Sequence, residues 1–310
     1  MTIATVTLNP AIDQTVTLGA LRRGQVQRAS SVRFNAGGKG VNVASCLADW
    51  GLSVAATGLL GRDNATSFEA LMRAKAIEDR FVRIEGATRT NIKLVDPEET
   101  TDVNLPGFTA TPEALAASTA EASALAGRCD LVVLAGSLPQ GAPEEHYASL
   151  LATLAEAGKP VILDASGPAL ARALAGPAMP HAIKPNAAEL GELAGEPLTS
   201  LHYIAKAARR LQAAGIALVV VSMGAEGALF CSEAGLIRAR LPAISGGSSV
   251  GAGDAMVAGL AAAMAEGADL ERTARLASAF AVGKLGLAGP NLPGRDIIEE
   301  LAAQAGIDTP

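Results

Sequence analysis

The stretch around which the chain is organised is Ser248-Ser249-Val250-Gly251-Ala252-Gly253-Asp254-Ala255-Met256-Val257-Ala258-Gly259. Two glycines frame a small residue, an aspartate follows, and small and apolar residues as far as Met264 predict a buried helix. Because Gly251 and Gly253 lack a Cβ, the backbone there can turn sharply and approach a ligand. The start of a helix also offers unpaired N–H groups and partial positive charge, which favour an anion. Asp254 is therefore a candidate base beside an anion hole, and a helix cap is the alternative interpretation.

Composition limits the class of protein. The chain has 310 residues, of which 49% are apolar and 18% are charged, enough for one large α/β domain with a sizeable core. Aromatic residues make up 3% and the formal net charge is −6, with no basic run. These values argue against a nucleic-acid-binding protein.

Cysteines and the chain's apolar runs bear on its compartment. Cys46, Cys129 and Cys231 form no CxxC pair, which predicts free, mostly buried thiols in a reducing cytosol. Residues 1–8 lack the positively charged start of a signal peptide, and the apolar run after Ala255 is too short and interrupted to span a bilayer. We therefore expect a cytoplasmic protein with no membrane partner.

From residue 111 onward, predicted strands and helices alternate. Helices are predicted over 112–126, 143–157, 187–194, about 200–214, and from Asp254, Leu270 and Arg295. Strands are predicted over 131–135, 161–164, 182–184 and 218–222, with a hairpin at 228–237. This alternation is typical of a parallel sheet covered by helices on both faces.

The first third of the chain is less regular. Strands over 3–8 and 52–60 and helices over 41–50 and 64–76 fit the same alternation. More polar strands, from about 11–35 and 90–106, do not fit it. They predict a small β-sheet lid inserted into a single domain that spans residues 1–310.

A second glycine cluster reads Asn35-Ala36-Gly37-Gly38-Lys39-Gly40-Val41-Asn42 and precedes a predicted helix. Backbone amides there could meet a ligand, and Lys39 adds a point charge. The GxxxxGK spacing of a Walker A loop is absent, as is the GxGxxG pattern of dinucleotide-binding folds. Taken alone, a glycine turn with a solvated lysine is the alternative.

Two further clusters follow predicted strands, where ligands bind in open parallel sheets. Lys184-Pro185-Asn186 leads to Glu189, and an amide with a carboxylate suits Mg²⁺ that also holds waters and substrate phosphates. On these residues alone the favoured interpretation is a helix-capping pair. Residues 222–227, Ser-Met-Gly-Ala-Glu-Gly, form a glycine-rich turn. The three histidines have no metal-ligand or triad spacing.

Together, these motifs resemble the ribokinase-like sugar kinases, the phosphofructokinase B family. The resemblance rests on Asn35–Ala44 and on Val250–Asp254, in this order and at the right separation, and it covers nearly the whole chain. Thr7–Asp13, Arg89–Leu94, Gly136–Pro139 and Lys184–Asn186 resemble the phosphosugar branch, closest to bacterial 1-phosphofructokinases and tagatose-6-phosphate kinases. The resemblance to this family implies a three-layer α/β/α fold with a mainly parallel sheet and a small β-sheet lid.

The resemblance also implies roles for individual residues. Asp254 would be the base, and Gly251, Ala252 and Gly253 the anion hole. The substrate-binding residues would be Asp13, Gly38, Lys39, Asn42, Arg89, Asn91 and Ser137. ATP would lie along Lys184, Asn186, Ser222, Gly224, Gly227, Gly253 and Ser278. Mg²⁺ would be held by Glu189 and Asn186 through water.

The implied reaction is ATP-dependent phosphorylation of a ketohexose monophosphate, fructose 1-phosphate first. Tagatose 6-phosphate, fructose 6-phosphate and unphosphorylated sugars or nucleosides are alternative acceptors, and a non-catalytic binding protein is the alternative from another class. We expect a homodimer formed through the lid. Because Asp254 lies at a helix N-terminus, we also expect it to be ionised and only weakly basic. Lys284 falls near the place where some relatives coordinate a monovalent cation, and no potassium site is expected here.

Overall fold

A mainly parallel sheet forms the centre of the computed structural model, which describes residues 1–242, 251–287 and 289–310. Its strands are β1 (Thr2–Thr7), β4 (Ser53–Gly61), β5 (Glu78–Asp79), β6 (Val82–Ile84), β9 (Leu131–Ala135), β10 (Val161–Asp164), β11 (Ala182–Ile183), β12 (Leu218–Ser222), β13 (Ala228–Ser232), β14 (Gly235–Arg240) and β15 (Gly306–Asp308). Their order is β15-β14-β13-β12-β11-β10-β9-β1-β4-β5, with β6 also paired to β4. Pairs from β5 to β12 are parallel, and pairs from β12 to β15 are antiparallel.

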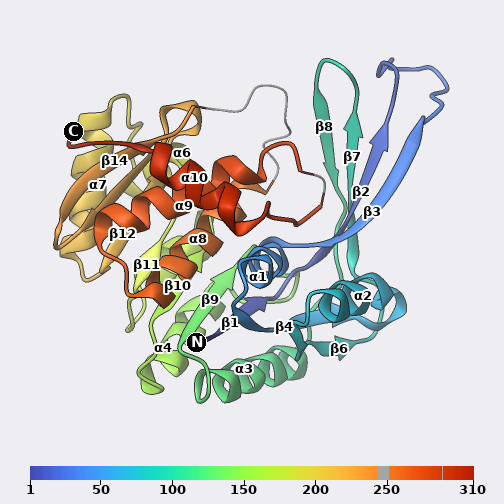
Figure 1. Ribbon diagram of the computed structural model, residues 1–310. Helices are drawn as coiled ribbons and strands as arrows, with labels where there is room; N and C mark the ends of the chain where they lie inside the picture. The colour runs from blue at the N-terminus through green and yellow to red at the C-terminus, as the bar shows by residue number, and fades with distance from the viewer. Residues whose placement is uncertain (243–250, 288) are drawn as a thin grey trace.

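Helices cover both faces of this sheet (Figure 1). One layer holds α1 (Lys39–Asp49), α2 (Thr66–Ala74), α8 (Ala252–Glu266), α9 (Leu270–Lys284) and α10 (Arg295–Gln304). The other holds α3 (Pro112–Ala126), α4 (His146–Glu156), α5 (Gly167–Leu174), α6 (Ala187–Ala194) and α7 (Leu201–Ala213). Strand residues alternate between the layers: Val133 packs with the first and Val132 with the second. The predicted three-layer α/β/α fold is confirmed.

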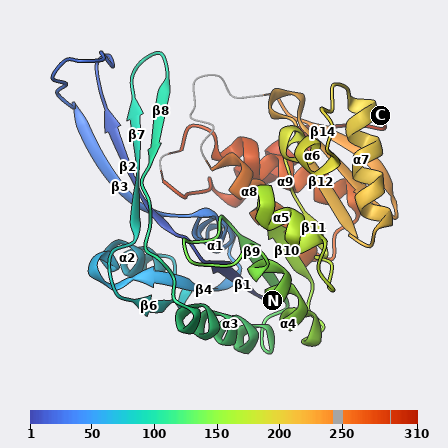
Figure 2. The ribbon, with the colours of Figure 1, turned by 180° about the vertical axis from the view of Figure 1, so that it is seen from behind.

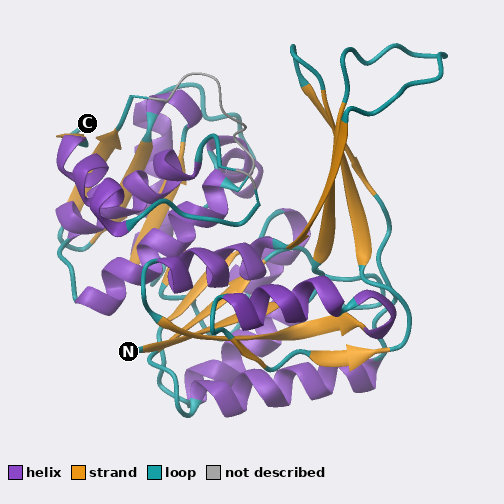
Figure 3. Ribbon diagram, turned by 45° about the vertical axis from the view of Figure 1, so that its right-hand side comes forward, coloured by secondary structure: helices purple, strands orange, loops and turns teal. Residues whose placement is uncertain are grey.

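A separate four-stranded sheet stands apart from the main body (Figures 2 and 3). Its strands are β2 (Ala11–Thr17), β3 (Ser31–Gly37), β7 (Arg89–Val95) and β8 (Thr100–Asn104), in the order β3-β2-β7-β8. These strands come from the two segments predicted to form a small sheet, although residues 18–30 between β2 and β3 are not strand.

The small sheet has one polar and one apolar face. Asp13 pairs with Asn35 and Asn91, so these side chains lie on one face. The neighbouring Gln14 pairs with Phe34 and Ile92, which therefore lie on the other face. By the same alternation Val16, Val32, Leu94 and Val103 join the face of Phe34. Phe34 is 61% exposed on this face.

Several elements differ from the sequence prediction. Helix α5 is only eight residues long and was not predicted, although Pro168 lies in its first turn, a position that favours a helix start. The two- and three-residue strands β5, β6 and β15 are too short to show a period. Helix α8 begins at Ala252, two residues before the predicted start. The described cysteines are free and buried, as predicted. None of the described helices combines the length and apolar character needed to cross a membrane.

Candidate active site

The candidate site lies where the first turns of α1 and α8 meet the carboxyl ends of the parallel strands. Lys39 is the first residue of α1, and its ammonium contacts Asp164, the last residue of β10. Helices α1 and α8 pack on each other, and α8 also contacts β9 and β10. Segments far apart in sequence therefore converge at one edge of the sheet, which is the usual ligand-binding edge in such folds.

Asp254 is buried in the first turn of α8. Its Oδ2 accepts a hydrogen bond from Asn42 Nδ2 at 2.7 Å, which fixes the carboxylate against α1. The N-cap of α8 is Gly251, which has no side chain to accept a hydrogen bond from the first N–H groups. The interpretation of Asp254 as the N-cap is therefore wrong: glycine occupies the cap, and the carboxylate is directed to Asn42.

The electrostatic surroundings of Asp254 also differ from expectation. Burial and, to a smaller extent, the nearby Asp164 carboxylate raise its pKa, Asn42, Lys39 and Lys184 lower it, and the net result is a pKa of about 6. The prediction of a weakly basic carboxylate is wrong, because loss of hydration outweighs the favourable charges at this position. A carboxylate with a pKa of about 6 is a better proton acceptor near neutral pH than an ordinary aspartate.

Asp164 links two lysines of the cluster. Its Oδ2 lies 3.1 Å from Lys39 Nζ, and its Oδ1 lies 3.6 Å from Lys184 Nζ. Asp164 and Lys184 are both buried. Burial lowers the pKa of Lys39, but Asp164, Asp254 and Glu189 raise it more, so the ammonium is held in its charged form. The arrangement places two fixed cations within one cluster.

The glycines of α8 bring its backbone close to these cations. A Cβ on Gly253 would lie 3.5 Å from Lys184 Nζ, so the lysine ammonium faces the bare first turn of the helix. Gly251 has φ of 81°, a left-handed conformation that favours glycine. Ala252 and Gly253 are the first two helical residues, whose N–H groups have no partner within the helix. Ser248, Ser249 and Val250 lie outside the described residues.

The predicted substrate-binding residues line the base of the small sheet. Asn91 Nδ2 donates to Asp13 Oδ1 at 3.3 Å, and Asn91 Oδ1 is buried with no hydrogen-bond partner among the described residues. Arg89 donates to the Asn9 and Pro10 carbonyls, each at 3.4 Å. Burial raises the pKa of the Asp13 carboxyl.

Ser137 and Gly38 complete this set. Asn9 Nδ2 donates to the hydroxyl of exposed Ser137 at 3.1 Å. This bond connects the loop after β9 to Asn9, whose carbonyl accepts from Arg89. Gly38, with φ of 107°, is the N-cap of α1. It packs so closely on Pro10 that a Cβ on Gly38 would lie 2.9 Å from the Cα of Pro10. The polar side chains of the small sheet and of the α1 start therefore lie around connected loops.

The predicted nucleotide residues are distributed along the neighbouring strand ends. Asn186 and Glu189 form a capping box at the start of α6, as the favoured interpretation of these residues alone predicted. Asn186 Oδ1 accepts from the Glu189 amide at 2.9 Å, and Glu189 Oε2 accepts from the Asn186 amide at 2.8 Å. Ser222 ends β12 and pairs with Asn186 through an isolated bridge. Gly224 and Gly227 both have positive φ. Ser278 is buried in α9, and its hydroxyl has no partner among the described residues.

The donor set fits magnesium only as a sparse site. Among the described residues, no three His, Cys, Asp or Glu side chains cluster tightly enough to hold an ion by themselves. The Glu189 carboxylate is close enough to Lys39 to contribute to the raised pKa of its ammonium. A carboxylate that accepts one N–H bond keeps lone pairs for water or an ion. This fits Mg²⁺, which retains several waters and substrate phosphates.

Comparisons with known proteins identify the family of the chain. Residues 6–293 match the pfkB family of carbohydrate kinases. The chain belongs to this family. It is 54% identical to a 1-phosphofructokinase of Xanthomonas campestris over 91% of this chain and 90% of that protein, and 49% identical to one of Rhodobacter capsulatus over 99% and 98%. The phosphofructokinase-2 of Escherichia coli in complex with substrates and products is 28% identical, with a TM-score of 0.91 over 98% and 99% of the two chains.

One residue of this pfkB kinase was missed in the sequence. Asp164 lies at the centre of the cluster, between two lysines, yet no motif around it was recognised. The available signal was its place: a carboxylate that ends the buried run Val161-Ile162-Leu163, at the edge where ligands bind.

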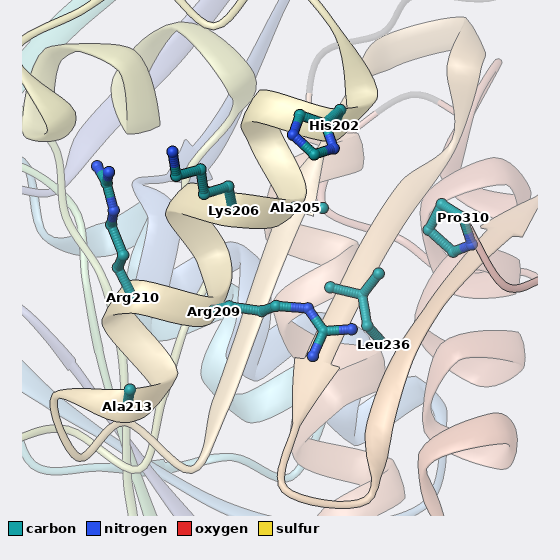
Figure 4. A pocket seen from close by; sticks show the side chains of 8 residues that line it. All are labelled: His202, Ala205, Lys206, Arg209, Arg210, Ala213, Leu236 and Pro310. Atoms are coloured by element: carbon teal, nitrogen blue, oxygen red, sulfur yellow. The ribbon is translucent and has the colours of Figure 1, made fainter.

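This pfkB kinase also has a separate groove of about 560 Å³ on the outer side of α7. It is lined by His202, Ala205, Lys206, Arg209, Arg210, Ala213, Leu236 and Pro310. Figure 4 shows the Arg209 side chain extended toward Leu236. The groove shares no lining residue with the Asp254 cluster.

Proposed function

We propose that this carbohydrate kinase is an ATP-dependent 1-phosphofructokinase. It transfers the γ-phosphoryl group of ATP to the free 6-hydroxyl of fructose 1-phosphate, which gives fructose 1,6-bisphosphate and ADP. The 54% and 49% identities to proteins named 1-phosphofructokinase support this acceptor over fructose 6-phosphate, since the phosphofructokinase-2 structure is 28% identical. The observation that carries the chemistry is buried Asp254, fixed by Asn42 beside Lys39 and Lys184.

Asp254 acts as the base. Its carboxylate accepts the proton of the sugar hydroxyl while the O–P bond forms. Asn42 occupies Oδ2, so Oδ1 is the oxygen left to receive the proton. The transition state of phosphoryl transfer is loose, and the hydroxyl proton becomes acidic late, so orientation of the carboxylate matters more than high basicity.

Charge stabilisation comes from the cations and amides around the first turn of α8. Lys184 and the N–H groups of residues 251–253 stabilise negative charge on the transferring phosphoryl group, because they are already oriented around the first turn of the helix. Asp164 holds Lys184 and Lys39 in place. Glu189 and Asn186 hold Mg²⁺ through water, and the ion neutralises phosphate charge when it is bound.

The acceptor is held from two sides. Lys39 at the start of α1 and Arg89 at the start of β7 bind the phosphate already on the sugar, together with Asn91 and Ser137. Asp13, Asn42 and Gly38 contact the sugar. The polar face of the small sheet carries Asp13 and Asn91, so closure of this sheet over the sugar excludes water from the reaction.

The nucleotide lies on the other side of the Asp164 cluster. Lys184 and Asn186 bind its phosphates, and the turn from Ser222 through Gly224 to Gly227 runs along it. Ser278 supports it from α9, where its buried hydroxyl has no partner within the described part of the chain. The glycines of the turn have positive φ, which lets the backbone approach a planar or phosphate group closely.

A coupled assay of ADP release tests the proposal. Purified protein is assayed with Mg-ATP and, in turn, fructose 1-phosphate, fructose 6-phosphate, tagatose 6-phosphate and fructose. We expect the highest kcat/KM with fructose 1-phosphate. In Lys39→Ala, KM should rise more for the phosphosugar than for fructose. Equal effects on both, or a higher kcat/KM for another acceptor, would contradict the assignment.

The small sheet also supports a homodimer. Its face opposite the sugar-binding side carries Val32, Phe34 and Val103, each more than 40% exposed. An apolar sheet face of this kind is usually covered by a partner. A second copy of the chain would bury it without covering Asp13 on the other face. Light scattering on the purified protein should give twice the chain mass, and the mass of Phe34→Asp should fall toward that of one chain.

A further inference from the structure

Asn9 lies between Ser137 and Arg89, two of the residues proposed to bind the phosphate of the sugar. Strands β1 and β9 are parallel neighbours, with Val6 opposite Leu134. Asn9 and Ser137, each two residues beyond the end of its strand, therefore lie opposite each other at the edge where ligands bind. Asn9 is uncharged and is not among the residues proposed to touch the sugar or the nucleotide.

The orientation of the Asn9 side-chain amide is fixed by its partners. Its Nδ2 donates to the Leu138 carbonyl at 3.3 Å and to Ser137 Oγ at 3.1 Å. A carbonyl oxygen can only accept, so the nitrogen of the amide, which has two N–H groups, must face Leu138. The second N–H group then meets Ser137 Oγ, and the serine is the acceptor in this bond.

This bond determines what the Ser137 hydroxyl can do. A hydroxyl has one hydrogen to donate and lone pairs that accept. Because Asn9 occupies a lone pair, the hydrogen of Ser137 stays available, and within the described part of the chain Ser137 donates no hydrogen bond. Ser137 is also exposed. Its free hydrogen is therefore suited to a phosphate oxygen, which is a strong acceptor.

Asn9 is connected with Arg89 as well. The Asn9 carbonyl accepts from Arg89 Nη2 at 3.4 Å. A Cβ on Gly107 would lie 3.1 Å from Asn9 Oδ1 and 3.4 Å from Arg89 Cδ, so the amide and the arginine stem flank the same glycine. Asn9 Oδ1 is buried and finds no donor among the described residues. A buried acceptor without a donor lowers stability, so we expect the side chain of Asn9 to contribute little to the folding free energy.

We propose that Asn9 is a positioning residue for recognition of the phosphate already on the sugar. Its amide holds Ser137 so that the hydroxyl hydrogen is presented to a phosphate oxygen, and its carbonyl steadies the Arg89 guanidinium. Asn9 touches neither the substrate nor the transferred phosphoryl group, so it affects the affinity for the phosphosugar and not the turnover. The inference rests on the proposed kinase function, because that reaction supplies the phosphosugar.

The test separates KM from kcat. In Asn9→Ala the Ser137 hydroxyl can turn away, so KM for fructose 1-phosphate should rise about 10-fold, the worth of one hydrogen bond to a charged group. Asn9→Asp keeps the shape but presents a carboxylate, which takes the Ser137 hydrogen and repels the phosphate, and KM should rise about 10²-fold. In both variants kcat, KM for ATP and the melting temperature should stay near those of the wild type. A merely structural asparagine would lower the melting temperature and leave KM for the sugar unchanged.

A double-mutant cycle tests whether Asn9 acts through Ser137. If it does, Asn9→Ala combined with Ser137→Ala should raise KM little more than Ser137→Ala alone, whereas independent effects would multiply. The matched control is Gln140→Ala. This exposed amide belongs to the same loop but accepts from the Thr109 hydroxyl at 3.3 Å, so its loss should leave KM for the sugar in place.

Wild-type KM in both Asn9 variants, or multiplied effects in the double variant, would overturn the role of Asn9. Activity of the wild type on fructose 1-phosphate would in that case still support the proposed function. Absence of activity on every phosphosugar in the wild type would overturn the proposed function and the inference with it, so the two failures are distinguishable.

Discussion

Helices α6 and α8 carry a carboxylate at the same place, the third residue of the helix, and use it in opposite ways. In α6, Glu189 turns back to its own N-cap and closes a capping box with Asn186. In α8, Asp254 makes no such bond and is held instead by Asn42 of another helix. The difference is the N-cap: Asn186 offers a side chain and an extended backbone, whereas Gly251 offers neither.

The comparison shows how a structural position becomes a chemical one. Glu189 remains partly exposed in a local hydrogen-bonded pair. Asp254 is buried, next to Asp164, and its pKa rises to about 6. A glycine cap leaves the carboxylate free, and burial then makes it basic. The carboxylates of α6 and α8 should therefore respond differently to the same substitution of acid by amide.

The largest effect is expected for Asp254→Asn. The amide keeps the size of the side chain and can still contact Asn42, but it cannot accept the proton. We expect kcat to fall by at least 10²-fold, the usual contribution of a positioned base. The measurement is steady-state ADP release with saturating substrates. Asp269→Asn, at the N-cap of α9, is the control, because asparagine caps a helix as well as aspartate and kcat should not change.

The same variant should change the dependence of stability on pH. The folded-state pKa of Asp254 is raised from 3.8 to about 6, so its protonated form is favoured by folding, and the wild type loses up to ~3 kcal/mol as pH rises through this window. Asp254→Asn has no carboxyl group to ionise, so its free energy of unfolding does not fall in this way as pH rises. It should melt above the wild type at pH 8, and the difference should shrink below pH 5. A constant difference across this range would show that Asp254 is not perturbed.

The sequence was sufficient to predict the layers and the two helix starts that meet at the candidate site. Runs such as Val219-Val220-Val221 and regular alternation after residue 111 predict the parallel sheet, and two glycine clusters indicate the helix starts that meet at the site. Asp164 was missed because its partners, Lys39 and Lys184, are brought to it only by the fold. The basicity of Asp254 was predicted wrongly for the same reason: burial depends on all the elements packed around it, and no local pattern reports it.

A smaller effect is expected for Glu189→Gln. Glutamine at the third position still closes a capping box, so the melting temperature should not change. If Glu189 holds Mg²⁺ through water, the apparent affinity for Mg²⁺ should weaken about 10-fold or more, in line with other outer-shell partners of metals. The measurement is kcat against free Mg²⁺ at fixed ATP. Glu192→Gln, exposed on the same helix, should leave this curve in place, and an unchanged curve for Glu189→Gln would remove the residue from the metal site.

The smallest effect is expected for Asn186→Ala, and it bears on the cap itself. The alanine removes the side chain that accepts from the Glu189 amide, so unfolding should become easier by about 1 kcal/mol, with a fall in melting temperature of about 2 °C. Thr111→Ala removes the equivalent bond at the start of α3, where Thr111 accepts from the Ala114 amide at 3.2 Å. The two variants should lose similar stability, but only Asn186→Ala should also weaken Mg²⁺ dependence. If Asn186→Ala, like Thr111→Ala, leaves the Mg²⁺ dependence of kcat unchanged, the start of α6 serves only as a helix cap. In that case α6 and α8 differ fully: the first carboxylate stabilises its helix, and the second acts in the reaction.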